Sequence, residues 1–230
     1  MAAQRETSRG KIVFRTLLYL VIMLVVFFAP AGRLDWWEGW IFLSGFLGCT
    51  IFIAIWMRRY DPDLVKERTQ RGENVKGWDN ILMAFYTVLL LAMLVLASFD
   101  SGRFNWSPTS LAAKICGGIG LLFAFSLVWR VMAENTYLSE RVRIQEERGH
   151  RVVSTGPYSV VRHPMYVGII VAIICTPLVL DSWLALVPGV LIAVIFIIRT
   201  AMEDRTLQDE LPGYREYAAR VRYRLVPGIW

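Results

Sequence analysis

The chain has 230 residues, of which 56% are hydrophobic and only 19% are charged, and its formal net charge is +6. A soluble domain is typically about 45–50% apolar and about 25% charged. The composition therefore excludes a disordered chain, a collagen-like fibre and a disulfide-rich secreted module. Two classes remain: a single compact domain, or a membrane protein with a small aqueous part.

The apolar residues are gathered into six blocks, which cover residues 12–29, 40–57, 81–99, 111–132, 165–180 and 183–198. A helix needs about 20 residues to cross a bilayer, within a range of about 17–25. The first four blocks reach that range, so residues 12–132 are expected to hold four spans. Only Asp181 and Ser182 separate the last two blocks, which predicts a helical hairpin. We therefore predict an all-α polytopic membrane protein, one domain over residues 1–230 with about six transmembrane helices.

The lysines and arginines are distributed unevenly between the segments that connect these blocks. Of the 25 basic residues, all but Arg33, Arg103 and Lys114 fall in the N-terminal tail through Arg15, between the second and third blocks, from Arg130 to the fifth block, or after the sixth block. Cytoplasmic loops collect Lys and Arg, so the pattern predicts that both termini are cytosolic. The positive charge then lies near anionic lipid headgroups, and no nucleic-acid partner is expected. The sequence predicts no oligomeric state.

Several familiar site types are not expected. The three cysteines, Cys49, Cys116 and Cys175, all fall inside apolar blocks and are expected to be small core residues rather than disulfide or metal sites. Two histidines do not suffice for a multi-histidine metal centre. The Gly-Gly-Ile-Gly run at 117–120 lies inside an apolar block, which predicts close helix packing rather than a phosphate-binding loop.

Residues 143–166 hold both histidines, two tyrosines and four arginines, side chains that can bind a ligand. The Gly-Pro pair at 156–157 predicts a turn, and Pro164 suits the first turn of a helix. Arg162 and His163 would then stand at a helix N-terminus, where unpaired backbone N–H groups favour anions. Each residue alone could be an interfacial anchor, but together they indicate a ligand site.

The end of the last apolar block is the second informative feature. Arg199 and Glu203 are four residues apart and therefore share one helix face. The pair could be an ordinary helix-end ion pair of about 0–1 kcal/mol, yet Arg199 directly follows an apolar run, where charged residues tend to be functional. Beyond it, Tyr214, Tyr217, Val221 and Leu225 have helical spacing. That tail is expected to lie along the interface or to fold back over the pocket.

Together these residues resemble the isoprenylcysteine carboxyl methyltransferase family of integral membrane enzymes. The pattern is H-x-V-V-x-x-G-P-Y-x-x-x-R-H-P-x-Y over 150–166, then R-x-x-x-E-[ED]-x-x-L over 199–207, and a Gly-Tyr, Tyr, Val and Pro series over 213–227. The resemblance identifies residues 143–227 as a methyltransferase-like core. Two short stretches, 61–68 and 76–79, are similar to a loop of bacterial members, which implies a bacterial inner membrane.

What the resemblance implies is S-adenosylmethionine bound at the cytosolic face, with no metal, and a lipophilic or prenylated acceptor that arrives from the membrane. Arg199 takes the place of the family's substrate-side, catalytic arginine, and Asp204 that of a second acidic residue with a longer side chain. The cofactor pocket implied by motif position comprises Gln145, His150, Arg151, Val152, Val153, Tyr158, Arg162, His163, Pro164, Tyr166 and Glu203.

The chemistry of these side chains is compatible with that cofactor. Arg162, His163 or the helix N-terminus can bind its carboxylate, Glu203 its ammonium or ribose, and the tyrosines can pack on its adenine. Two alternatives stay open: an NADPH-dependent sterol-type reductase, which shares a similar R-H-P-x-Y stretch, and a non-enzymatic scaffold or transporter. Nothing in the sequence chooses among a carboxylate, an amine and a thiol as methyl acceptor.

Overall fold

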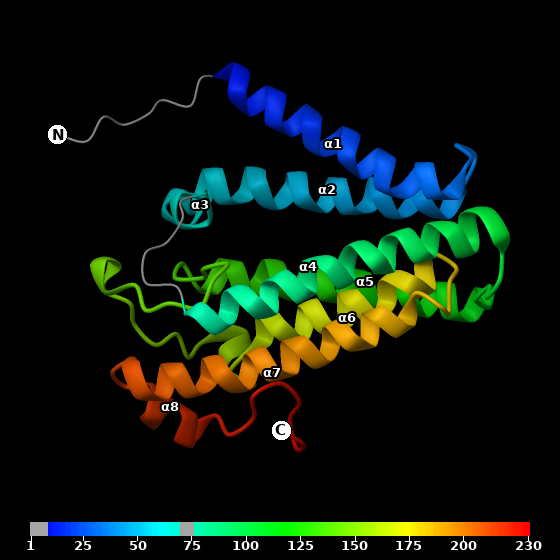
Figure 1. Ribbon diagram of the computed structural model, residues 1–230. Coiled ribbons are helices and arrows are strands. Elements are labelled where there is room, and N and C mark those ends of the chain that lie inside the picture. Colours follow the sequence, from blue (N-terminus) through cyan, green and yellow to red (C-terminus); the bar gives the residue numbers. More distant parts are fainter. Residues whose placement is uncertain (1–8, 70–75) are drawn as a thin grey trace.

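The computed structural model describes residues 9–69 and 76–230, and over these residues it contains helices and no strand (Figure 1). Six long helices run alongside one another: α1 (Arg9–Ala31), α2 (Trp37–Tyr60), α4 (Gly77–Ala97), α5 (Leu111–Glu134), α6 (Pro164–Val179) and α7 (Leu186–Glu210). Shorter elements connect them: α3 (Pro62–Thr69), the π-helical turn η1 (Ser98–Phe104), the 3₁₀ turns η2 (Glu146–Arg148) and η3 (Gly156–Ser159), and α8 (Tyr214–Arg220). Each predicted block thus corresponds to one long helix.

Four of these helices are long and apolar enough to cross a membrane. They cover Trp37–Tyr60, Gly77–Phe104, Leu111–Glu134 and Leu186–Glu210. The apolar part of α1, Thr16–Ala31, and α6 are shorter, so six spans remain a prediction. Large apolar side chains such as Ile55, Phe85 and Leu122 are 60–68% exposed. Contiguous apolar surface of this kind is typical of helices that face lipid.

The glycines of α5 bring it into close contact with α6. A Cβ on Gly117 would lie 2.9 Å from Leu178 Cβ and 3.1 Å from the Cys175 carbonyl oxygen, and a Cβ on Gly120 would overlap Cys175 Sγ. On the α6 side, a Cβ on Gly168 would lie 2.8 Å from Val128 Cγ2. Small residues let helix backbones approach, so the prediction of close packing at residues 117–120 is confirmed.

Gly117→Ala is therefore expected to destabilise the protein by about 1–3 kcal/mol, because the atoms that its Cβ would crowd, Leu178 Cβ and the Cys175 carbonyl oxygen, belong to or adjoin the α6 backbone. Gly118→Ala is the matched control, since no atom lies within 4 Å of its Cβ position. There the gain in helix propensity, about 0.5–1 kcal/mol, should leave stability equal or higher. Thermal unfolding of both variants in detergent measures the difference. Equal midpoints would contradict close α5–α6 packing.

The predicted hairpin between the last two blocks is present as α6 and α7. Its turn passes through Asp181, which has a φ of +61°. Residues of α5 and of the segment before α5 hold this turn in place. Thr109 donates to Asp181 Oδ1 from its backbone N (2.6 Å) and its hydroxyl (2.9 Å). Lys114 Nζ lies 2.8 Å from Asp181 Oδ2 and 3.2 Å from Glu38 Oε1. This end of the bundle is therefore closed by ion pairs and hydrogen bonds.

The opposite end carries the basic segments. α3, the long segment from α5 to α6, the end of α7 and α8 all lie at the left in Figure 1, whereas the turn after α1 with Arg33, η1 with Arg103 and the start of α5 with Lys114 lie at the right. The separation of charge expected from the sequence is thus a property of the fold. Which side of a membrane this basic end faces stays a prediction, namely the cytosolic side.

Candidate functional site

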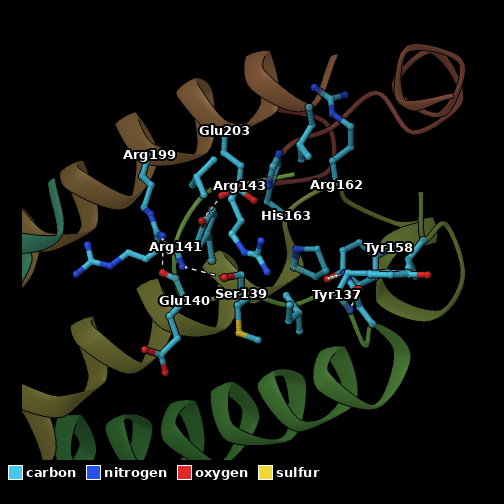
Figure 2. A pocket seen from close by; sticks show the side chains of 18 of the residues that line it. Tyr137, Ser139, Glu140, Arg141, Arg143, Tyr158, Arg162, His163, Arg199 and Glu203 are labelled. Atoms are coloured by element: carbon cyan, nitrogen blue, oxygen red, sulfur yellow. Dashed lines mark hydrogen bonds between the residues drawn. The ribbon is translucent and has the colours of Figure 1, made fainter. Parts of the chain in front are cut away.

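A cavity of about 390 Å³ lies at the basic end of the bundle (Figure 2). Small-molecule sites typically measure about 300–1,000 Å³. The cavity is walled by α7, the start of α6, α4 and the segment of residues 135–153, and α8 contributes Tyr214 and Tyr217. Helices that are far apart in the chain therefore share one concave surface.

Eleven of the twelve predicted site residues line this cavity. They are His150, Arg151, Val152, Val153, Tyr158, Arg162, His163, Pro164, Tyr166, Arg199 and Glu203. Pro164 is the first residue of α6, as its position before the apolar block predicted. Gly156 and Pro157 form the 3₁₀ turn η3, in which Gly156 has a φ of +56°. The turn brings Tyr158 back toward the start of α6.

Arg199 is buried and held by a carboxylate that the sequence analysis did not select. Its Nε and Nη2 donate to Asp79 Oδ1 (2.7 Å) and Oδ2 (3.3 Å), and Nη2 also donates to the Glu140 carbonyl (2.9 Å). The guanidinium carbon lies 5.3 Å from the centre of the Tyr166 ring. Figure 2 shows Arg199 and Glu203 extending from α7 into the same space.

Glu203 and Tyr166 are joined across the cavity wall by a hydrogen bond from the Tyr166 hydroxyl to Glu203 Oε2. The Tyr166 ring lies parallel to the His163 ring, with centroids 5.8 Å apart. Glu203 lines the cavity, and its Oε1 has no hydrogen bond among the described residues. It is therefore a free anionic acceptor, of the kind that binds an ammonium or a pair of hydroxyls.

Asp204 is fully buried just behind the cavity and organises a polar network that we call the Asp204 network. It accepts from Arg162 Nε (2.7 Å) and Nη2 (3.0 Å), from Arg224 Nε (2.9 Å) and from the Tyr214 hydroxyl (3.1 Å). Gln208 also donates to it, and His163 Nε2 lies 3.2 Å away. The shorter acidic side chain at this position therefore joins α6, α7, α8 and the C-terminal segment.

Arg162 has few donors left for a ligand. Beyond its two bonds to Asp204, its Nη1 donates to the carbonyls of Val221 and Arg222, each at 2.8 Å. Its backbone N donates to the Tyr223 carbonyl (2.9 Å). Arg162 thus binds the C-terminal segment to the start of α6. A contact between Arg162 and a cofactor carboxylate stays a prediction, and His163 and the α6 N-terminus are less committed.

His150 stands at the other end of the cavity, against the ring of Tyr137 (centroids 4.9 Å apart). Its Nδ1 is sealed from solvent and has no hydrogen-bond partner among the described residues. Burial, reinforced by the positive charges of Arg148 and Arg143, lowers the pKa of His150 from 6.5 to about 4. A neutral imidazole with an unpaired buried nitrogen is a ready contact for a polar ligand atom.

Because the pKa of His150 is lowered by folding, the free energy of unfolding should depend on pH. Between about pH 4 and pH 6.5 the unfolded chain binds a proton at His150 that the folded chain does not. The His150 contribution is therefore fully present above pH 6.5 and declines as the pH falls toward 4. An NMR titration of the two histidine rings, with His150→Gln to assign them, should give a midpoint near 4 for His150. A midpoint near 6.5 would contradict a buried, neutral ring.

Gln145 is the one predicted site residue that does not line the cavity. Its Nε2 donates to the Tyr137 carbonyl (2.5 Å), and its Oε1 accepts from Arg148 Nη1 (2.6 Å). Its own carbonyl accepts from the backbone N of Arg148 and of His150. Gln145 therefore shapes the segment that carries His150, and its contact with a cofactor stays a prediction.

Three tyrosines of the cavity are held as neutral groups by burial. Burial raises the pKa values of Tyr158, Tyr214 and Tyr217 above their usual range. Tyr217 donates from its hydroxyl to the Tyr158 carbonyl (2.7 Å), and Asn135 Nδ2 donates to the Tyr158 hydroxyl (2.8 Å). These residues supply flat apolar rings and fixed polar tips, but no base near neutral pH.

The cavity also contains residues that the sequence analysis missed. Tyr86 and Met83 come from α4, and Tyr137, Glu140, Arg141 and Arg143 come from the segment after α5. Arg143 is held by Glu67 of α3 through two bonds (3.0 and 2.7 Å). Asp79 offered the clearest signal, because an acidic residue at the start of an apolar block is costly to bury without a partner.

Comparison with known proteins agrees with the motifs. Residues 114–209 match the family model of the isoprenylcysteine carboxyl methyltransferase (ICMT) family. The resemblance is thereby confirmed over these residues, which include most of α5, all of α6, the 150–166 motif, Arg199 and Glu203. The nickel-cobalt-cadmium resistance protein NccN of Alcaligenes xylosoxydans xylosoxydans is 27% identical over 135 residues, which are 57% of this chain. The chain covers 59% of the length of that relative.

Proposed function

We propose that this chain, an ICMT-family membrane protein over residues 114–209, binds S-adenosylmethionine in the cavity and transfers its methyl group to a lipophilic acceptor. The observation that carries the proposal is the convergence of two motifs. His150, His163 and Tyr166 from one, and Arg199 and Glu203 from the other, line a single space of about 390 Å³.

The polar and aromatic side chains of the cavity match the chemical groups of the cofactor. Glu203 Oε1 is free to accept from an ammonium or from ribose hydroxyls, and His150 Nδ1 is a sealed polar atom that lacks a partner. Tyr158 and Tyr137 add rings on which an adenine could pack. When bound, S-adenosylmethionine supplies an electrophilic methyl group on a sulfonium centre, which is displaced by an in-line nucleophile.

The protein's part in such a transfer is alignment and exclusion of water. Arg199 orients the acceptor, because it is a buried cation that lines the cavity one helical turn from Glu203, whereas the donors of Arg162 are taken by Asp204 and by backbone carbonyls. Met83 of α4, Ile169 of α6 and Phe196 of α7 form an apolar wall, and α4 and α7 are long and apolar enough to cross a membrane. That wall supports a lipophilic acceptor, such as an isoprenylcysteine carboxylate or a related lipid or thiol, reached from the membrane.

Equilibrium titration of the detergent-purified protein with S-adenosylmethionine and, separately, with NADPH tests this proposal. S-adenosylmethionine should bind and NADPH should not. Glu203→Gln should weaken binding by about 1.5–3 kcal/mol, roughly 10- to 100-fold, because a charge-assisted contact is lost.

Asp209→Asn is the control for the Glu203 variant. Asp209 is on the same helix, but its side chain is 54% exposed and pairs with Arg215 outside the cavity. Its titration should match that of the unmodified protein. NADPH binding without S-adenosylmethionine binding would replace the proposal with a membrane reductase.

A further inference from the structure

We propose that Asp79 is a positioning residue for the methyl acceptor, because it holds Arg199 so that one guanidinium nitrogen, Nη1, is directed to the cavity. The inference rests on the proposed function for the identity of the ligand. It assigns to α4, which precedes the family-matched segment, a part in acceptor recognition.

The contacts of Asp79 leave it no freedom to turn. It lies in the first turn of α4 and is fully buried. Its two oxygens accept from Arg199 Nε and Nη2, and Oδ2 also accepts from the backbone N of Val142 (3.1 Å). The carboxylate therefore joins α4, α7 and the wall segment that contains Glu140 and Arg141. A shift of any one of these parts moves the others.

The same contacts decide which donor Arg199 offers. Nε and Nη2 are occupied by Asp79 and the Glu140 carbonyl, and Nη1 has no hydrogen bond among the described residues. Within that part of the chain, the side-chain polar atoms that are both sealed and unpartnered are Trp129 Nε1 and His150 Nδ1. Nη1 has no partner and is not one of these two sealed atoms, so it is accessible to a ligand or to water. Arg199 itself lines the cavity.

The positive charge of Arg199 is balanced by the negative charge of Asp79, and this decides how Arg199 acts on a ligand. A buried guanidinium without a counter-ion is strongly destabilising, and Asp79 supplies the counter-ion. The cavity consequently meets the guanidinium of a neutral ion pair, with one free NH2 group, Nη1, rather than an unopposed cation. Such a donor orients an acceptor oxygen or sulfur more than it attracts any passing anion.

The first experiment uses the full-length protein in detergent, with N-acetyl-S-farnesyl-L-cysteine as the acceptor probe. Asp79→Asn removes the charge, and Asp79→Glu keeps it but displaces the oxygens by one methylene. Both variants should lower kcat/KM for the probe at least tenfold, while the Kd for S-adenosylmethionine changes less than twofold. In an Arg199→Ala background, Asp79→Asn should add less than a twofold further loss, because Asp79 acts through Arg199.

The control is Asp181→Asn at the far end of the bundle, which also breaks a partly buried ion pair, with Lys114. It should change the thermal midpoint without changing kcat/KM for the probe. If Asp79 only stabilised the fold, its variants would lower cofactor affinity and acceptor turnover together. Equal loss in both, or a full additional loss in the Arg199→Ala background, would overturn the inference.

A second readout does not depend on turnover. In protein labelled with ¹⁵N-arginine, Arg199→Lys identifies the Arg199 Nε–H resonance by its disappearance. Asp79→Asn should move that resonance to the position of solvated arginines, and Asp181→Asn should leave it in place. An unmoved resonance would overturn the role of Asp79. Absence of cofactor binding in the unmodified protein would instead refute the proposed function.

Discussion

Asp204→Ala is expected to lower the stability of the protein by about 3–5 kcal/mol and to release residues 221–230 from the start of α6. The substitution removes the carboxylate to which Arg162, Arg224 and Tyr214 all donate hydrogen bonds. It also leaves the buried guanidinium of Arg162 without a counter-ion. Thermal unfolding in detergent measures the loss, and hydrogen exchange of residues 221–230 measures the release.

The control for this prediction is Asp209→Ala, five residues further along α7. Asp209 forms ion pairs with Arg215 and Arg205, but all three side chains are at least half exposed. Exposed pairs contribute about 0–1 kcal/mol. A similar effect of the two substitutions would mean that the Asp204 network does not hold the C-terminal segment.

Arg199→Ala is expected to reduce methyl transfer by roughly 10²–10³-fold, the usual effect of removing a pre-positioned donor from a reacting group. The Kd for S-adenosylmethionine should stay within a factor of two, because the cofactor contacts are assigned to Glu203, His163 and His150. Labelled-methyl transfer and cofactor titration, made on the same preparation, separate the two effects.

Removing Arg199 also leaves Asp79 buried and unpaired, so thermal unfolding must show that the variant is folded. Arg199→Lys keeps a positive charge but cannot reproduce the paired contacts to Asp79, and it should lose most of the activity too. Arg205→Ala, on the same helix with a side chain that is 87% exposed, is the control. Full turnover and an unchanged acceptor KM in Arg199→Ala would refute the role of Arg199.

The elements most accessible to sequence reasoning were those set by local composition. Apolar blocks became helices because a chain in lipid must satisfy its backbone hydrogen bonds internally. Pro164 begins α6 because its fixed φ suits the first helical turn. The helical spacing of the C-terminal residues was a weaker guide. Tyr214 and Tyr217 are in α8, but the helix ends at Arg220, and Val221 and Leu225 lie beyond it.

The sequence predicted those site residues that belong to the two motifs, and it did not predict their tertiary partners. Asp79 and Arg199 are 120 residues apart in the chain, and their pairing depends on how α4 packs against α7. Nor could the pattern reveal that the donors of Arg162 are taken by Asp204 and by carbonyls of the C-terminal segment. Which donors remain free for a ligand is decided by tertiary hydrogen bonds, and these have no local signature.

In the proposed reaction the cavity holds S-adenosylmethionine next to a lipophilic acceptor that Arg199 orients. Transfer of a tritiated methyl group, measured in proteoliposomes against a panel of prenylcysteines, phospholipids and thiols, tests it most directly. We expect labelling of at least one lipophilic acceptor by the unmodified protein and loss of that labelling in both Glu203→Gln and Arg199→Ala. No labelling of any acceptor, or labelling that persists in both variants, would contradict it.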